Sequence, residues 1–247
     1  MSKFFSNSAG DARKTELRLE PVGRRLFLRM AGAAAATTSL MVAGCSKDPI
    51  TGDDMTARGG ARIAAGVDLG SGDVGILNYA YALEQLEAAF YDMVVKMPYN
   101  GINADERQIL KDIRDHEITH REFFKRALGS AAIGDLEVDF SAVNFKDRNS
   151  VLTTARAFED LGVSAYNGAG KYLMTPDYLL LAGKIVSVEA RHASVIRSLL
   201  APKTGHYAGV DVVNGEGLEK SREPKDVLAI ASPFVKTMIT GPNLPNM

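Results

Sequence analysis

The sequence contains no tryptophan and a single cysteine, Cys45, and these scarcities narrow the possible chemistry. One cysteine cannot form an intramolecular disulfide, and there is no cysteine cluster to bind zinc or an iron–sulfur centre. Aromatic residues make up only 7% of the chain, and no long basic run occurs. With a formal net charge of −1, the protein is not expected to bind nucleic acid.

Long hydrophobic runs are also missing, because the apolar stretch at 31–43 is shorter than the roughly 20 residues needed to span a bilayer. We interpret residues 1–45 as an export signal. Arg24 and Arg25 precede Leu-Phe-Leu, which resembles a twin-arginine export signal, and the Val-Ala-Gly-Cys ending at Cys45 resembles a lipobox. A bacterial lipoprotein of the periplasm or outer membrane is therefore expected. The alternative is a short amphipathic helix with an incidental cysteine.

The remainder of the chain divides into three parts. Residues 1–44 hold seven of the 29 Lys/Arg and three of the 30 Asp/Glu, so the rest has a net charge of −5. Residues 46–72 are rich in Gly, Asp, Ala and Ser and predict a flexible tether. Residues 73–200 predict a helical domain. Residues 201–247 predict a polar loop followed by a helix over 225–240.

Apolar residues at helical spacing predict four helices, which makes the fold all-α. The expected ranges are 73–97, 103–128, 150–169 and 175–200. Asp73 or Ser71 is expected to cap the first helix, and Asn103 with Glu106 resembles a capping box. The first and third connections are short, whereas the second, over 129–149, is about 20 residues long. Two antiparallel hairpins joined by one long crossover are expected.

Two Glu-x-x-His pairs lie within these helices. Glu117 and His120 are three residues apart on the second helix, and Glu189 and His192 are three apart on the fourth. Residues at this spacing share one helix face. Both pairs fall on apolar faces, where a carboxylate costs several kcal/mol unless it is paired, protonated or bound to a cation. The pairs therefore predict a metal site inside the bundle.

The other two helices repeat the pattern. Glu84 is followed seven residues later by Tyr91, and Glu159 is followed seven residues later by Tyr166. Glu84 and Glu159 are 75 residues apart, and the two Glu-x-x-His pairs are 72 residues apart. Such regular spacing indicates an internal duplication.

This pattern resembles the ferritin-like superfamily, whose four-helix bundle takes one Glu from each of two helices and a Glu-x-x-His pair from each of the others. The run over 77–91 looks most like bacterial ferritin-like proteins related to plant desiccation-related proteins, and the resemblance covers about residues 73–200. It implies six metal ligands: Glu84, Glu117, His120, Glu159, Glu189 and His192. Glu117 and Glu189 would bridge the ions, and Tyr91 and Tyr166 would donate hydrogen bonds to ligands.

Two residues depart from the simple pattern. Glu87 is a further ligand, a replacement for Glu84 or a surface charge, since many family members have a small residue there. His116 precedes Glu117 and is interpreted as a neighbour of the site or a surface residue rather than a ligand.

The resemblance and the ligand types imply two Fe or two Mn ions and a di-metal oxidoreductase that acts on oxygen or peroxide, ferroxidase-like or peroxidase-like, in stress defence. A manganese-catalase-like enzyme is one alternative. A non-catalytic, lipid-anchored desiccation or stress protein with a vestigial site is another. A rubredoxin-type domain would need four cysteines, so rubrerythrin-like electron transfer is not expected. The sequence is compatible with an oligomer.

Overall fold

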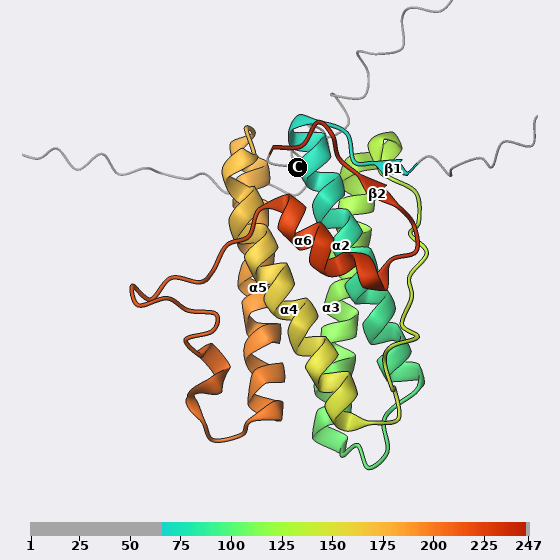
Figure 1. Ribbon diagram of the computed structural model, residues 1–247, viewed down its shortest axis with the longest axis vertical. Coiled ribbons are helices and arrows are strands. Elements are labelled where there is room, and N and C mark those ends of the chain that lie inside the picture. Colours follow the sequence, from blue (N-terminus) through green and yellow to red (C-terminus); the bar gives the residue numbers. More distant parts are fainter. Residues whose placement is uncertain (1–65, 246–247) are drawn as a thin grey trace, which may run out of the picture. The chain divides into compact units, whose positions relative to one another are not determined.

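The computed structural model describes residues 66–245, which are built around a four-helix bundle (Figure 1). The four helices are α2 (Gly72–Lys96), α3 (Ala104–Leu128), α4 (Arg148–Ala169) and α5 (Pro176–Leu200). The connection over 129–147 runs the length of the bundle, so α3 and α4 point the same way while each hairpin is antiparallel (Figure 1). The predicted all-α fold with its long crossover is confirmed.

Local sequence explains most of the helix ends. The Asn103 side chain accepts the amide hydrogen of Glu106 at the start of α3, and the Asp147 side chain does the same for Ser150 at the start of α4. Gly129 ends α3 with a φ of 56°, a conformation that residues with side chains rarely adopt. Every predicted boundary of the four helices lies within two residues of the observed one.

The predicted caps are only partly correct, because some of these side chains form hydrogen bonds with other parts of the fold instead of capping their own helix. Ser71 occupies the cap position of α2, but its side chain makes no capping hydrogen bond. The Asp73 carboxylate instead accepts the amide hydrogens of Met174 and Thr175, at 2.7 and 2.9 Å, which joins the start of α2 to the start of α5. Glu106 does not complete a capping box, since its carboxylate accepts hydrogen bonds from Tyr99 and Arg148.

The prediction of a helix over 225–240 is wrong in its second half. Helix α6 covers Pro224–Ala231, and a 3₁₀ turn follows at Ser232–Phe234. Pro233 lies within this turn, and proline has no amide hydrogen and clashes with the preceding helical turn. The chain therefore leaves the helix before 240.

A short parallel pairing joins the two ends of the described chain. Strand β1 (Val67–Asp68) pairs with β2 (Ile239–Thr240), and Leu69 beside β1 is fully buried. These first residues fall inside the predicted tether, so the folded unit begins before the predicted boundary at residue 73. Because the pairing joins residues far apart in sequence, neither strand has a local sequence signal strong enough to predict it.

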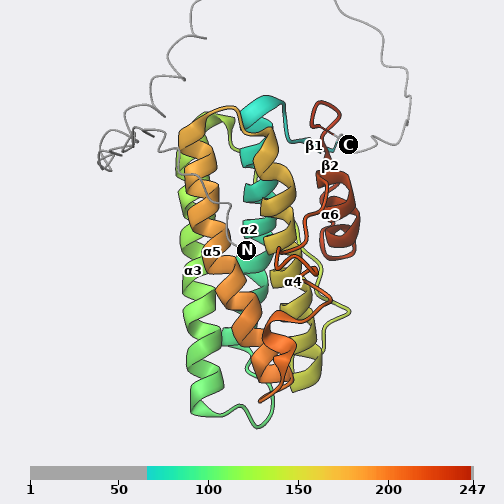
Figure 2. The same cartoon turned by 90° about the vertical axis from the view of Figure 1, so that its left-hand side faces the viewer.

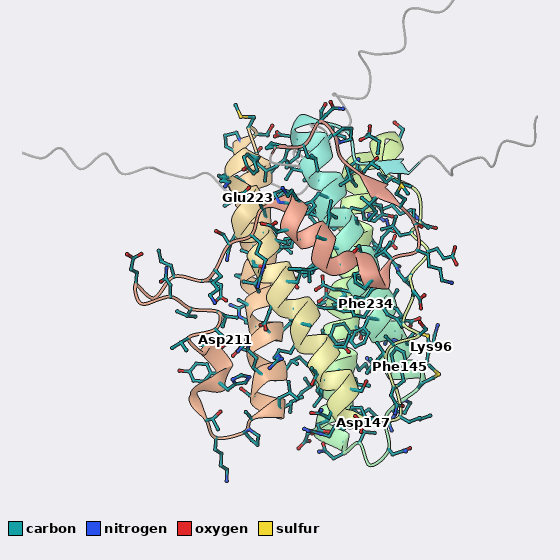
Figure 3. The ribbon with its side chains drawn as sticks, in the orientation of Figure 1. Lys96, Phe145, Asp147, Asp211, Glu223 and Phe234 are labelled. Carbon is teal, nitrogen blue, oxygen red and sulfur yellow. The ribbon has the colours of Figure 1, made fainter. Side chains whose placement is uncertain are left out.

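Helix α6 covers the side of the bundle formed by α2 and α4, away from α3 and α5 (Figure 2). Phe234, at the end of this segment (Figure 3), packs edge-on against Phe158 of α4, with ring centroids 4.8 Å apart. Phe158 in turn packs against Phe90 of α2 at 5.1 Å. None of the helices within residues 66–245 is long and apolar enough to cross a membrane.

Candidate metal centre

The six predicted ligands all point into the middle of the bundle. Each of the four carboxylates is fully buried, and the side chains of His120 and His192 are only 12% and 5% exposed. Apolar layers lie on both sides of them: on α3, Ile113 is buried on one side of Glu117 and Phe124 on the other. The sequence-based placement on apolar helix faces is correct.

The ligand atoms form two overlapping groups. The first group, which we call the Glu84 position, consists of Glu84, Glu117, His120 and Glu189. The second group, the Glu159 position, consists of Glu117, Glu159, Glu189 and His192. Within each group, one potential ligand atom of every residue lies within 4.8 Å of the others. Glu117 and Glu189 belong to both groups, as the bridging role requires.

Each histidine lies closest to the shared carboxylate of the opposite hairpin. His120 Nδ1 is 2.9 Å from Glu189 Oε1, compared with 3.4 Å from Glu84 Oε2. His192 Nδ1 is 2.7 Å from Glu117 Oε1, compared with 3.5 Å from Glu159 Oε2. The shortest contacts of the two histidines therefore both run between the hairpins, a pattern that we call crosswise.

The two tyrosines follow the same crosswise rule. Tyr91 donates a hydrogen bond to Glu159 Oε1 at 2.5 Å, and Tyr166 donates one to Glu84 Oε1. Each tyrosine thus supports the glutamate of the other hairpin and leaves the second oxygen of that glutamate facing the centre. The sequence predicted the donors but not that they exchange partners.

The hydrogen bonding within the cluster is incomplete in a way that fits a cation. Eleven buried side-chain nitrogen or oxygen atoms in the described chain have no hydrogen-bond partner, and nine of them belong to the six ligands and Glu87. His120 Nδ1 and His192 Nδ1 are among them although carboxylate oxygens are close, because the atoms are not aligned as hydrogen bonds. Converging, unpaired lone pairs are the arrangement that a metal ion satisfies.

Comparison with known proteins agrees with this geometry. A family model described as a ferritin-like domain matches residues 72–202, which is more than half of the chain. This chain belongs to the ferritin-like domain family. A search of curated proteins finds no significant match. The matched region contains all four bundle helices and all six ligand residues of the candidate centre.

Electrostatics in this ferritin-like domain favour proton or metal binding. Burial raises the pKa of Glu159 to about 7 and that of Glu117 to about 8, and the charge of Glu189 adds to both. Burial acts to raise the pKa of Glu189 too, but its contacts with His120 and His192 outweigh this effect and lower it. Burial alone would lower the pKa of His120, yet its contacts with the carboxylates raise it to about 12. A metal ion would therefore compete with protons for these ligands.

Glu87 is a fifth carboxylate in the ferritin-like core, which excludes the surface-charge interpretation. It is buried, its Oε1 has no hydrogen-bond partner, and burial followed by the charges of Glu117 and Glu189 raises its pKa well above the usual range. It does not replace Glu84, which is in the ligand groups where Glu87 is not. A Cβ on Gly162 would be 3.1 Å from Glu87 Oε1, so this glycine makes room for the carboxylate.

His116 contacts a ligand rather than acting as one. Its Nδ1 is 2.9 Å from Nε2 of His192, and the two rings stack with centroids 5.1 Å apart and planes 13° apart. His116 is thus an exposed residue that neighbours the site, and it contacts Nε2 of His192, the ring nitrogen that faces away from the carboxylates.

Sequence reasoning missed a buried ion-pair network beside the centre. Arg197 is 1% exposed and donates hydrogen bonds to both oxygens of Asp160, to both oxygens of Asp211 and to the carbonyl of His206. Asp211 lies on the C-terminal segment beside α5 (Figure 3). The network attaches this segment to α4 and α5. Its only sequence signal was an arginine on the apolar face beside Ile196. The predicted export residues Arg24, Arg25 and Cys45 lie outside the described residues.

Proposed function

We propose that this protein binds two iron or two manganese ions between its four helices, with Glu117 and Glu189 shared by both ions. The observation that carries the proposal is the pair of overlapping ligand groups, whose potential ligand atoms lack hydrogen-bond partners. Carboxylate oxygens with one imidazole per position suit Fe or Mn. Four carboxylates also balance the charge of two divalent ions, which makes the buried site tolerable.

We propose further that the centre performs oxygen or peroxide chemistry of a ferroxidase or peroxidase kind. A pair of such ions, when bound, supplies one-electron steps to oxygen or peroxide. The protein contributes the surroundings: Tyr91 and Tyr166 fix the carboxylates, and burial raises the pKa of both phenols, so they remain proton donors. The buried apolar layers on both sides exclude bulk water.

The test begins with metal analysis of the full chain after native expression. We expect close to two Fe or Mn ions per chain, and well under one ion per chain would reject the proposal. The variants Glu117→Ala and Glu189→Ala each remove a ligand from both positions and should lose both ions. Glu122→Ala, an exposed glutamate on α3, is the matched control and should retain both.

Activity assays distinguish the candidate enzyme activities from one another. Ferroxidase activity predicts oxygen-dependent oxidation of added Fe²⁺, and peroxidase activity predicts peroxide loss that depends on a reductant. Oxygen evolution from peroxide without a reductant would instead identify a manganese-catalase-like enzyme. A fully loaded protein that is inactive in all three assays would favour a non-catalytic stress protein.

We propose that the protein acts outside the cytoplasm, where a lipid anchor holds it at a membrane. We propose that its role there is stress defence. This proposal is supported by the twin-arginine-like and lipobox-like segments of the sequence. We expect the Cys45→Ser protein to be released from membranes, whereas Ser46→Ala protein should remain bound. Membrane retention of the Cys45→Ser protein would contradict lipidation at this residue.

A further inference from the structure

We propose that the two metal positions are not equivalent: the Glu159 position binds its ion first and more tightly, and the Glu84 position holds the exchangeable ion. This inference rests on the proposed dinuclear centre and concerns how that centre fills. It arises from the places where the two halves of the duplicated sequence differ.

The first difference lies at His116. Applying the 72-residue offset between the halves, the counterpart of His116 is Val188, which cannot form a hydrogen bond through its side chain. A metal ion bound at Nδ1 of His192 requires the proton to be on Nε2, and His116 Nδ1 lies 2.9 Å away to accept it. Within residues 66–245 no hydrogen bond to Nε2 of His120 is found. His116 therefore fixes the ring and tautomer of one ligand histidine and leaves the other unsupported.

The second difference lies at Glu87. Applying the 75-residue offset, its counterpart is Gly162, and the structure brings the two together. Gly162 is one turn beyond Glu159, and a Cβ placed on it would be 3.8 Å from Glu189 Oε2. That oxygen is the one nearer to His192, whereas the other oxygen of Glu189 faces His120. Glu87 thus adds a buried carboxyl oxygen without a hydrogen-bond partner on the side of the Glu159 position.

Exposure points in the same direction. The side chain of His192 is 5% exposed and that of His120 is 12% exposed, so solvent and exchanging ions reach the Glu84 position more easily. A supporting hydrogen bond and an added carboxylate both strengthen cation binding, and outer partners of this kind typically change metal affinity by about 10–100-fold. All three differences favour the Glu159 position.

The experiment is a titration of the metal-stripped full chain with Mn²⁺, with free Mn²⁺ counted by electron paramagnetic resonance. We expect two binding steps whose dissociation constants differ by about tenfold or more. Glu159→Gln should remove the tighter step, and Glu84→Gln should remove the weaker one. If the wild-type protein binds no Mn²⁺ or Fe²⁺ at all, the dinuclear centre itself fails. If it binds two ions with one affinity, only the present inference fails.

The supporting residues are tested in the same titration. His116→Ala should weaken the tighter step by about tenfold and leave the weaker step unchanged, while Val188→Ala should alter neither. His116→Asn retains a hydrogen-bond acceptor and should restore much of the affinity. Glu87→Gln should likewise weaken the tighter step alone. Equal weakening of both steps in the His116→Ala and Glu87→Gln proteins, with unchanged circular dichroism, would overturn the assignment.

Discussion

The α2–α3 hairpin and the α4–α5 hairpin carry the same ligand types in different surroundings. Glu84, Glu117 and His120 of the first hairpin have counterparts at the repeat offsets in the second, and the supporting tyrosines are exchanged between hairpins. The residues around these ligands differ. Glu87 lies beside Gly162, its counterpart in the second hairpin, and His116 contacts His192 but not His120. The repeated spacing thus places the same ligand types in both hairpins, whereas the residues next to them differ between the two positions.

The residues that directly follow Glu84 and Glu159 also differ between the two hairpins. Gln85, after Glu84, donates to the carbonyl of Gly134 and accepts the amide hydrogen of Leu136, which attaches the crossover to α2. Asp160, after Glu159, instead binds Arg197, which attaches the C-terminal segment. Equivalent positions in the two hairpins therefore attach different covering segments, one through a neutral amide and the other through ion pairs with the buried Arg197.

The largest expected effect on stability comes from the ionic attachment of the second hairpin. Arg197→Met should lower the free energy of unfolding by about 2 kcal/mol, somewhat less than a fully buried ion pair because Asp211 is half exposed. Its counterpart at the 72-residue offset, Lys125, forms an exposed pair with Asp135 at 3.4 Å. Lys125→Met should change stability far less, because the Lys125–Asp135 pair is exposed to solvent. Urea unfolding of both variants measures the contrast, and equal losses would contradict it.

Because each tyrosine donates to the glutamate of the other hairpin, removing its hydroxyl should weaken metal binding at the position of that other glutamate. Tyr166→Phe removes the hydrogen bond to Glu84 and should weaken the Glu84 position by about tenfold. Tyr91→Phe removes the hydrogen bond to Glu159 and should weaken the Glu159 position to a similar degree. Mn²⁺ titration assigns each effect by comparison with Glu84→Gln and Glu159→Gln. The reverse assignment would show that each tyrosine supports its own hairpin.

The raised pKa values of Glu159 and Glu117 predict opposite pH trends with and without metal. Because burial raises the folded pKa of Glu159 to about 7 and that of Glu117 to about 8, the folded chain binds more protons than the unfolded one. Metal-free protein should therefore lose stability as pH rises from about 5 to 8, starting from the unfolded value near 4.3. Metal affinity should increase over the same range. Melting temperatures with and without a chelator test both signs, and parallel trends would contradict them.

The smallest effect is expected at the position where the hairpins differ most. Gly162→Ala brings a Cβ to 3.1 Å from Glu87 Oε1, which offsets the roughly 1 kcal/mol that alanine gains over glycine in a helix. Gly183→Ala meets nothing within 4 Å and should show the full gain. Thermal unfolding of the two variants gives the difference. Equal stabilisation would mean that Glu87 moves aside freely.

The sequence predicted the helices, and the burial of the Glu and His residues that converge inside the bundle, because both depend on local spacing. Apolar residues three and four apart define a helix face, and Glu117 with His120 share that face whatever the rest of the chain does. The repeat offsets then related the two hairpins without any structure. The second half of the helix predicted over 225–240 was wrong because Pro233, in the turn after α6, has no amide hydrogen and clashes with the preceding helical turn.

By itself, therefore, the sequence determined which side chains line the candidate centre and that their spacing repeats in the two hairpins. Only the tertiary structure decided which partner each of them meets. Tyr91 meets Glu159, His116 meets His192, and Glu87 meets Gly162, all contacts across more than 65 residues of chain. Such contacts depend on how four helices are turned toward one another, which spacing along one helix does not specify. The proposed asymmetry of the candidate metal centre depends on that long-range packing.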